Sequence, residues 1–482
     1  MASDAPASPA IQPYPQRWLI LAAIVLTTFL GTWDGSAPVV ALPAITRQYG
    51  VGIDSAVWVL TLSSLLFAVP MAIFGKLGDM IGHKRIYLIA TLIYILAAAG
   101  AGTAPTFGWL IFFRSLEGLA SAPWFTAALA IFATTFAPNE RGRAMGIMGA
   151  GASLAWASGP LLGGLLLQAF DWQAIILVEI PVAILSLAMA WWLIPEDSHK
   201  TQEQFDLAGA ATFTGLALVL MFGLRIVSDS GWASLPTLAA GGAFVVILAL
   251  FILIERRHVA PFIPLNLFAN RRYTVATLFS ATQIVTQFAM MFLVPLYLLE
   301  VAGLDPAASG LIVAGLSVAR IIFEPVAGRI AELRGCRLPS TVGIGMIIAV
   351  AAGFAFVLAP TTPGGIIFTA LFVFGVGIVL GRTPVFLAVT HLADRERLGL
   401  ALGVFSMLTF AGGALGQTFF GVLLQTLSGS GSAPLATVPE PELVLAFSIC
   451  FALVVGLAAL AGVFAQDLPG RKMMNDVVAI HS

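Results

Sequence analysis

The segment LVLAFSICFALVVGLAALAGVF, residues 443–464, contains no charged side chain and no proline. A helix needs about 20 consecutive apolar residues to cross the hydrocarbon core of a bilayer. A membrane β-barrel would instead show short segments in which apolar and polar residues alternate. The segment therefore predicts a transmembrane helix, which satisfies its own backbone hydrogen bonds where no water is present.

Similar apolar windows follow one another along the chain. Of its 482 residues, 59% are hydrophobic and 10% are charged, and the mean hydropathy is +0.98. Ordinary soluble domains carry about 25% charged residues, so a chain of this composition cannot hide its apolar surface in water. We predict an all-α integral membrane protein with about 14 spans. The windows cover residues 18–45, 56–74, 86–103, 109–136, 144–170, 175–194, 207–227, 235–254, 274–299, 309–326, 338–360, 366–392, 400–424 and 443–464.

The composition argues against several other classes of protein. The net charge is −1, which gives no sign of nucleic-acid binding, and two cysteines make no disulfide framework. No Walker loop, no cluster of Cys and His and no nucleophile elbow occurs. We therefore expect a protein that is not an enzyme, has no metal site and no cofactor, and is driven by the proton gradient. Residues 1–17 lack a basic region, so no cleaved signal is expected.

The basic residues predict the orientation of the chain. With the N-terminus in the cytoplasm, they gather in the inside loops, and outside loops keep only Arg47. This asymmetry follows the positive-inside rule. We expect a multi-pass inner-membrane protein with both termini in the cytoplasm. The residues expected inside are Lys76, Lys84, Arg85, Arg141, Arg143, Arg256, Arg257, Arg271, Arg272, Arg329, Arg334, Arg337, Arg395, Arg397, Arg471 and Lys472.

Patterns of glycine and polar residues recur in the two parts of the chain. Such a repeat predicts two related helix bundles with substrate bound between them near the middle of the membrane. We expect six-helix bundles at residues 1–195 and 273–482. Two inserted helices and an amphipathic cytoplasmic loop are expected between them, at residues 196–272. The matching positions are Gly75, Asp79 and Gly82 with Gly328, Glu332 and Gly335, and Gly159, Gly164 and Gln168 with Gly416, Gly421 and Gln425.

Ionisable residues inside the spans are the strongest functional candidates, because a charge at a helix centre costs about 2.5–3.5 kcal/mol to insert. Arg114 and Glu117 share one helical face, and their depth matches that of Asp34 if the first and fourth spans face each other. A carboxylate near a cation there can exchange a proton as water arrives. The alternative is that Arg114 with Glu117, and Arg320 with Glu324, only permit insertion. The candidates for proton coupling or the substrate cavity are Asp34, Arg114, Glu117, Glu179, Arg320, Glu324 and Arg382.

The loop GKLGDMIGHKR, residues 75–85, predicts a tight cytoplasmic turn. Its carboxylate is placed to bond helix ends or basic groups across the seam between the bundles, and breaking those contacts would open a gate. A turn that only anchors the spans is the alternative, but it leaves the repeated acidic position unexplained. The predicted gate residues are Gly75, Asp79, Gly82, Lys84, Arg85 and Glu332.

In the fifth span, Gly159, Gly163 and Gly164 place small residues around Pro160. Small residues let helices approach closely, and a proline kinks a helix. Plain packing is the simpler interpretation, and a closely packed helix would also seal one side against leakage.

Together these motifs resemble the major facilitator superfamily, and within it the branch of fourteen-span drug/proton antiporters. The resemblance extends over nearly the whole chain, and it implies a two-bundle fold, with the fifth-span motif speaking for export. The similar segments are residues 75–85 for the signature loop, 114–118 (RSLEG) for the basic fourth-span motif, 159–164 (GPLLGG) for the antiporter motif, 32–34 (TWD) with 41–45 (ALPAI) for the first span, and 205–209 (FDLAG) with 231–232 for the inserted helices.

Four residues depart from the pattern of that family. Met80 stands where arginine is usual and His83 where another basic residue is common, so the charge relay of the loop is incomplete. Glu117 replaces a customary glutamine, and Glu179 a frequent asparagine. Both add acid to the expected cavity, which suits either extra proton coupling or cationic substrates. Glu179 is also close enough to Trp172 to lie at the outer water interface instead.

We therefore predict a proton-coupled antiporter that exports small amphipathic or cationic compounds, such as drugs, by alternating access. Its expected partners are the substrate, protons and membrane lipids, and not nucleic acid. A dedicated exporter of an endogenous lipid, siderophore or metabolite, with or without a periplasmic adaptor protein, shares every motif. A proton-coupled uptake symporter is disfavoured by the fifth-span motif, and a membrane sensor by the lack of an appended soluble domain.

Overall fold

The computed structural model describes residues 14–470 apart from residues 52, 138–139, 197–205, 232–233, 259–260, 262, 264–265, 305, 393–397 and 430–438. The described residues fold into helices, as the apolar windows predict. The helices are α1 (Arg17–Asp34), η1 (Ala37–Ala41), α2 (Leu42–Tyr49), α3 (Ile53–Ala68), α4 (Met71–Ile81), α5 (His83–Gly102), α6 (Phe107–Thr135), α7 (Arg141–Ala169), α8 (Gln173–Leu177), α9 (Glu179–Leu193), α10 (Leu207–Ser230), α11 (Leu235–Arg257), α12 (Asn266–Ala269), α13 (Arg271–Glu300), α14 (Pro306–Arg334), α15 (Arg337–Phe356), α16 (Gly364–Leu392), α17 (Leu398–Ser428) and α18 (Glu440–Gln466).

Eleven helices in the described part of the chain are long and apolar enough to cross a membrane, or up to 13 if each of two bent pairs is one span. The bent pairs are Trp58–Ala68 with Met71–Ile81, and Arg141–Gly159 with Leu162–Ala169. α10 adds the shorter apolar stretch Ala208–Leu220. The prediction of an all-helical membrane protein is confirmed, while the count of fourteen spans depends on α10 and stays a prediction.

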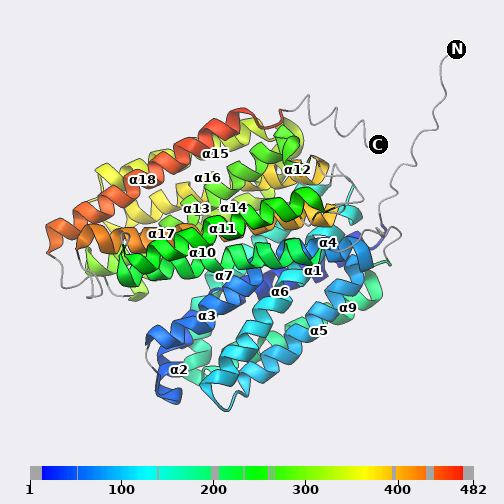
Figure 1. Ribbon diagram of the computed structural model, residues 1–482. Helices are drawn as coiled ribbons and strands as arrows, with labels where there is room; N and C mark the ends of the chain where they lie inside the picture. The colour runs from blue at the N-terminus through cyan, green and yellow to red at the C-terminus, as the bar shows by residue number, and fades with distance from the viewer. Residues whose placement is uncertain are drawn as a thin grey trace.

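The helices form two groups (Figure 1). In the first, α1 to α9, helix α5 packs against α6 and α9, and α1 packs against α6, α7 and α9. In the second, α13 to α18, helix α14 packs along α16, and α15 along α18. The inserted helices α10 and α11 pack on each other and lie beside the second group, where α10 contacts α17. The predicted boundary at residues 195–196 borders residues 197–205, which lie outside the described part.

The outer surface of both groups and of the inserted helices is apolar. Large side chains such as Leu235, Trp192 and Phe356 are 80%, 79% and 77% exposed. Monomeric soluble proteins rarely expose apolar patches of more than a few hundred Å². Helices of this kind are stable in lipid because their backbone groups are bonded internally. The apolar surface therefore faces the bilayer.

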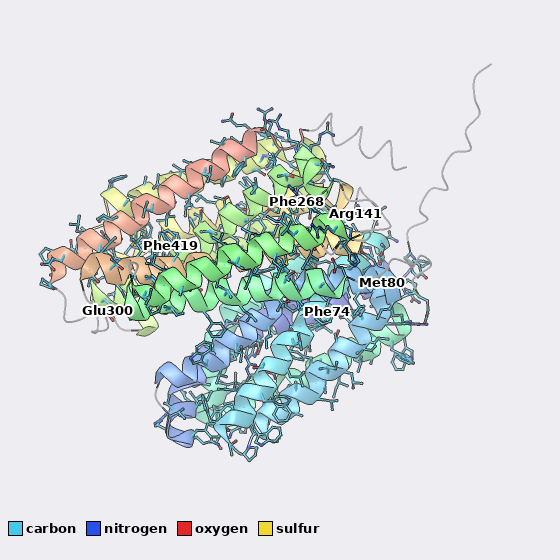
Figure 2. The ribbon with its side chains drawn as sticks, viewed as in Figure 1. Phe74, Met80, Arg141, Phe268, Glu300 and Phe419 are labelled. Carbon is cyan, nitrogen blue, oxygen red and sulfur yellow. The ribbon has the colours of Figure 1, made fainter. Side chains whose placement is uncertain are left out.

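One end of the molecule collects basic residues, and we call it the basic end. Figure 2 shows Met80, Arg141 and Phe268 at this end and Glu300 at the opposite end. The turns there repeat, because Gly82 between α4 and α5 and Gly335 between α14 and α15 have φ of 106° and 74°, a conformation that favours glycine. The basic end is defined by Lys84, Arg85, Arg141, Arg143, Arg256, Arg257, Arg271, Arg272, Arg334 and Arg337.

The two groups meet at the basic end through glycines. Gly75 of α4 lies so close to Gly399 and Gly403 of α17 that a Cβ atom on any of the three would overlap neighbouring atoms. In the same way, a Cβ atom on Gly328 of α14 would overlap the backbone of Gly142 of α7. Glycine at these positions lets the main chains of the two groups touch. Backbone contacts therefore close the seam at the basic end in two places, between α4 and α17 and between α14 and α7.

Cys336 lies between α14 and α15 and is buried, and its Sγ donates a hydrogen bond to the carbonyl of Pro384 at 2.8 Å. Burial raises the pKa of this thiol to about 12. With that pKa, roughly one thiol in 10,000 is ionised at pH 8, and the thiolate is the form that reacts. We expect Cys336 to resist maleimide at pH 8 in native membranes and to react once the protein is denatured, as peptide mass spectrometry can measure. Equal labelling before and after denaturation would contradict the prediction.

Candidate functional site

Four charged side chains from three helices meet inside the first group, and we call them the acidic cluster. Asp34 ends α1, Arg114 and Glu117 lie on α6, and Glu179 begins α9. Arg114 donates from Nη1 to the carboxylate of Asp34 and, at 2.5 Å, to Oε2 of Glu117. Arg114, Glu117 and Glu179 are at most 1% exposed, whereas Asp34 is 9% exposed. The first and fourth spans thus face each other at the depth of these residues.

The acidic cluster contains more acid than base. With Asp34, Glu117 and Glu179 all ionised, a single guanidinium would face three carboxylates. Burying an unpaired charge costs several kcal/mol, and a proton on a carboxylate removes that charge. The cluster is therefore suited to bind and release protons. Asp34 is the carboxylate that water reaches first, because it is the most exposed of the three.

Glu179 is buried among side chains of the first group. The hydroxyl of Tyr94 donates a hydrogen bond to Oε2 of Glu179, and the rings of Tyr94 and Trp124 are 5.1 Å apart. Glu179 also begins α9, where the helix dipole favours a negative charge. Its side chain is 1% exposed, so the structure gives no support to the alternative from the sequence that it meets water at the outer interface.

Tyr94 is a member of the site that sequence reasoning missed. It lies two turns along α5 from Tyr87, and both tyrosines are fully buried. Tyr87 contributes its hydroxyl to a hydrogen bond with Ser186 of α9 at 2.8 Å. Two tyrosines on one face of an apolar span were the available signal, since a buried hydroxyl needs a partner.

A second group of charges, which we call the basic cluster, lies in the second group of helices. Nη2 of Arg320 is 3.5 Å from Oε1 of Glu324 on the same helix, α14. Thr383 of α16 donates to Oε2 of Glu324 at 2.8 Å. The neighbouring Arg382 has no hydrogen bond or ion pair with the described residues. The basic cluster therefore contains two guanidiniums and one carboxylate, and only Arg320 is paired with that carboxylate.

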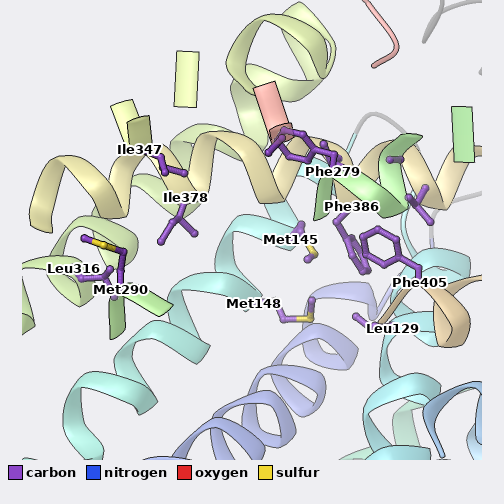
Figure 3. Packing of buried hydrophobic residues seen from close by; sticks show 14 of the residues in the cluster. Leu129, Met145, Met148, Phe279, Met290, Leu316, Ile347, Ile378, Phe386 and Phe405 are labelled. Carbon is purple, nitrogen blue, oxygen red and sulfur yellow. The ribbon is translucent and has the colours of Figure 1, made fainter. Parts of the chain in front are cut away.

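A cavity with about 770 Å³ of empty space, part of it open to solvent, lies between the two groups. The first group supplies mainly apolar side chains, and the second supplies most of the polar and all of the charged ones. Figure 3 shows Met145, Met148 and Leu129 near Phe386 and Phe405 across this region. The lining residues are Thr28, Phe125, Leu129, Met145, Met148, Gly149, Ala152, Ser280, Gln283, Ile284, Gln287, Arg320, Glu324, Arg382, Thr383, Phe386, Phe405, Ser406, Thr409 and Phe410.

The structure separates the seven ionisable residues that the sequence grouped together. Arg320, Glu324 and Arg382 line the cavity, whereas the described lining includes no member of the acidic cluster. The acids that depart from the family pattern, Glu117 and Glu179, therefore lie away from the cavity wall. The expectation that they favour a cationic substrate finds no support in this arrangement.

Polar residues of α13 were also missed from the sequence. Ser280, Gln283 and Gln287 line the cavity, and Nε2 of Gln283 donates to the carbonyl of Ile378 at 3.1 Å. They recur at helical spacing in an otherwise apolar span, and this recurrence was the signal that could have revealed them. Amides at this position can bond the polar part of a bound molecule.

Asp79 joins the two groups of helices at the basic end. Its carboxylate accepts hydrogen bonds from the backbone N–H groups of Gly399 at 2.9 Å and Leu400 at 2.7 Å. These residues form the first turn of α17, where N–H groups lack helical partners and the helix dipole is positive. On its own side, Asp79 lies 3.1 Å from Nε2 of His83. The repeated acid of the first half thus contacts a helix end across the seam.

The remaining predicted gate residues take different positions. Lys84 is half-buried and Arg85 is exposed, with Nη2 of Arg85 3.9 Å from Glu196 of the same group. Gly75 makes the close contact at the seam, and Gly82 makes the turn. The side chain of Glu332 lies outside the described residues.

The segment after α11 is bonded to the seam. Nζ of Lys76 on α4 donates to the carbonyl of Pro261 at 3.1 Å. Glu255 at the end of α11 accepts a hydrogen bond from the N–H of Ile263, with Oε2 at 3.2 Å. The inserted helices therefore connect to the same helix, α4, that carries Asp79.

The fifth-span motif packs against the end of the first span. A Cβ atom on Gly159 would overlap Ser36, and one on Gly163 would crowd Val40 and Ala37 of η1. Gly164 has open space around it, and the side chain of Pro160 lies outside the described part. α7 bends by 41° between Gly159 and Leu162. The motif therefore lets the bent α7 approach the segment that directly follows Asp34.

Gly75→Val is expected to keep the seam open at the basic end, because the added methyl groups overlap backbone of α17. Overpacking costs about 1–3 kcal/mol, which predicts up to about 100-fold greater access. The reporter is Ser406→Cys on the cavity wall, labelled by an impermeant maleimide added from the basic end. Gly345→Val, at a position with open space, is the control. Unchanged labelling in the Gly75 variant would argue against closure by this contact.

Two helix groups that close at one end around a central cavity, in an apolar shell with buried charges, define a polytopic membrane transporter. A family model described as Major Facilitator Superfamily matches residues 24–417. The chain belongs to this superfamily, so it is a transporter and not an enzyme.

Relatives of this chain include drug and vitamin transporters. The chain is 30% identical over 426 residues to the multidrug resistance protein Stp of Mycobacterium tuberculosis, covering 88% of this chain and 79% of that protein. It is 26% identical to the riboflavin transporter RibZ of Clostridioides difficile, covering 84% and 88%. Its fold matches the crystal structure of the human organic anion transporter MFSD10 (TETRAN), with a TM-score of 0.64 and 15% identity over 94% of this chain and 100% of that one.

Proposed function

We propose that the chain is a proton-coupled antiporter that exports small amphipathic compounds, including drugs, across the inner membrane. The observation that carries the proposal is the acidic cluster, in which Arg114 holds Asp34 and Glu117 in a buried site with excess acid. A multidrug resistance protein is among the relatives of the chain, at 30% identity. Protons and the exported compound are the two ligands, and the bilayer lipids surround both groups of helices.

The basic end lies in the cytoplasm in this proposal, because the positive-inside rule places loops rich in Lys and Arg there. Both termini then lie in the cytoplasm as well. The close contacts between Gly75 and Gly399, and between Gly328 and Gly142, would close the cytoplasmic side. The structure then corresponds to a state that faces outward.

Transport follows from competition between the proton and the exported compound. In the outward state, Asp34 takes up a proton, which weakens its bond to Arg114 and makes the net charge of the acidic cluster less negative. The seam at Asp79 then opens, the compound enters the cavity from the inside and the proton leaves to the cytoplasm. The glycines of the fifth span link proton uptake at Asp34 to the movement of the helices, since Gly159 packs beside Ser36, two residues after Asp34.

The proposal is tested with the purified protein in proteoliposomes that carry an imposed pH gradient and a pH-sensitive dye inside. Each compound of a panel of amphipathic antibiotics is added in turn. A transported compound is expected to move protons in the opposite direction. A panel in which no compound moves protons would contradict proton-coupled drug export.

A dedicated exporter of a metabolite is the second candidate, because a riboflavin transporter is among the relatives at 26% identity. A drug-susceptibility panel in a host that lacks its own pumps separates the two. Broad resistance is expected of a multidrug exporter and not of a dedicated one. Whether a periplasmic adaptor protein receives the cargo is tested by removing such adaptors from the same host.

A further inference from the structure

We infer that the central cavity selects amphipathic organic acids, with an apolar body and one carboxylate or similar anionic group held between Arg320 and Arg382. The inference names the substrate class of the proposed exporter and rests on that function for the transport step only. Binding of the acid follows from the cavity alone.

Arg382 is the first reason. Its side chain lines the cavity, it is only half-buried, and it has no hydrogen bond or ion pair with the described residues. A guanidinium presents five N–H donors in a planar fork that matches a carboxylate. These donors have no partner among the described residues, so a ligand that supplies an anionic acceptor can bond them, and charge-assisted hydrogen bonds are the strong ones.

The charge balance of the cavity wall is the second reason. Arg320 and Arg382 face one carboxylate, Glu324, which leaves a formal charge of +1 on the described lining. Glu324 is already engaged, because Thr383 donates to one oxygen and Arg320 lies 3.5 Å from the other. The Nε of Arg320 has no hydrogen-bond partner. One anionic group neutralises this wall, whereas a cation would add to its charge.

The opposite wall explains why the acid should be amphipathic. Phe125, Leu129, Met145 and Met148 come from the first group of helices and present apolar side chains to the cavity. Methionine adapts to ligands of different shape, and aromatic rings pack against flat bodies. The apolar body therefore rests on the first group and its acid group on the second.

The test uses three probes that share one dansyl body: dansylglycine, its methyl ester and dansylethylenediamine, which are an anion, a neutral compound and a cation. Binding to the detergent-purified protein is followed by fluorescence anisotropy at pH 7.5. Dansylglycine is expected to bind at least about tenfold more tightly than the other two, because hydrogen bonds to charged groups are the stronger ones.

Arg382→Gln is expected to weaken binding of dansylglycine at least about tenfold and to leave the ester within about threefold. Arg382→Lys keeps the charge and should recover part of the affinity. Arg272→Gln removes an exposed arginine of the basic end and is the matched control, with all three affinities unchanged. Thermal unfolding of each variant shows whether the protein remains folded, and the comparison of probes on the unchanged protein needs no variant.

The outcomes of binding and transport are distinct. Equal or tighter binding of the ester or the amine, absence of saturable dansylglycine binding, or an equal loss of all three probes in Arg382→Gln overturns the inference. Selective binding of dansylglycine without proton-driven transport of any probe supports the inference and counts against the proposed function. Proton-driven transport of dansylethylenediamine in preference to dansylglycine supports the proposed function and counts against the inference.

Discussion

Asp34→Asn is expected to abolish proton-driven accumulation while leaving exchange of substrate across the membrane intact. Asparagine has nearly the same shape as aspartate and can still accept a hydrogen bond from Arg114, but it cannot carry a proton. With one proton coupled to each substrate, a gradient of two pH units sustains about a 100-fold accumulation, and an uncoupled carrier sustains none. The ratio in proteoliposomes should therefore fall from about 100 to about one.

Asp171→Asn is the matched control for this experiment, because Asp171 is an exposed aspartate that follows α7. It should accumulate substrate as the unchanged protein does. Counterflow of labelled substrate, measured without a pH gradient, separates loss of coupling from loss of folding. An Asp34→Asn variant with full proton-driven accumulation would refute the role given to Asp34.

Asp79→Ala is expected to shift the protein toward a state that is open at the basic end. The variant loses two hydrogen bonds to a charged carboxylate, those from Gly399 and Leu400. Such bonds contribute about 1.5–3 kcal/mol each, so the ratio of open to closed molecules should rise at least about 100-fold. Electron-spin distance measurements between labels at Arg85→Cys and Arg337→Cys, one in each group, should show a longer distance become dominant.

Asp467→Ala provides the control for the seam. Asp467 also bonds a partner, Arg271, at 2.7 Å, but both residues are exposed and belong to the second group. Its loss should leave the label distances unchanged, because exposed ion pairs contribute little. The two native cysteines are buried and should not take up the spin label. A label distance that does not change in Asp79→Ala would show that the seam is held by other contacts.

Individual residues show why part of the site was predictable. Arg114 and Glu117 are neighbours on one helix, so their contact follows from helical spacing alone. The contact with Asp34 requires that the first and fourth spans face each other, and the sequence alone does not establish that they do. The partner of Asp79 is the N–H groups of Gly399 and Leu400. Backbone groups have no signature in the sequence, so only the fold identifies that partner.

Three properties follow from the sequence alone: lipid is the solvent, the chain is helical and two parts of it repeat. These properties depend on composition and on the spacing of residues along the chain, so they do not depend on which helices pack together. The tertiary structure fixes which buried charges share a site, because the position of each charge depends on how the helices are rotated and packed. It placed Asp34, Arg114, Glu117 and Glu179 in a closed acidic cluster, and Arg320 and Arg382 on the cavity wall. The sign of the charge on the cavity wall follows from that division.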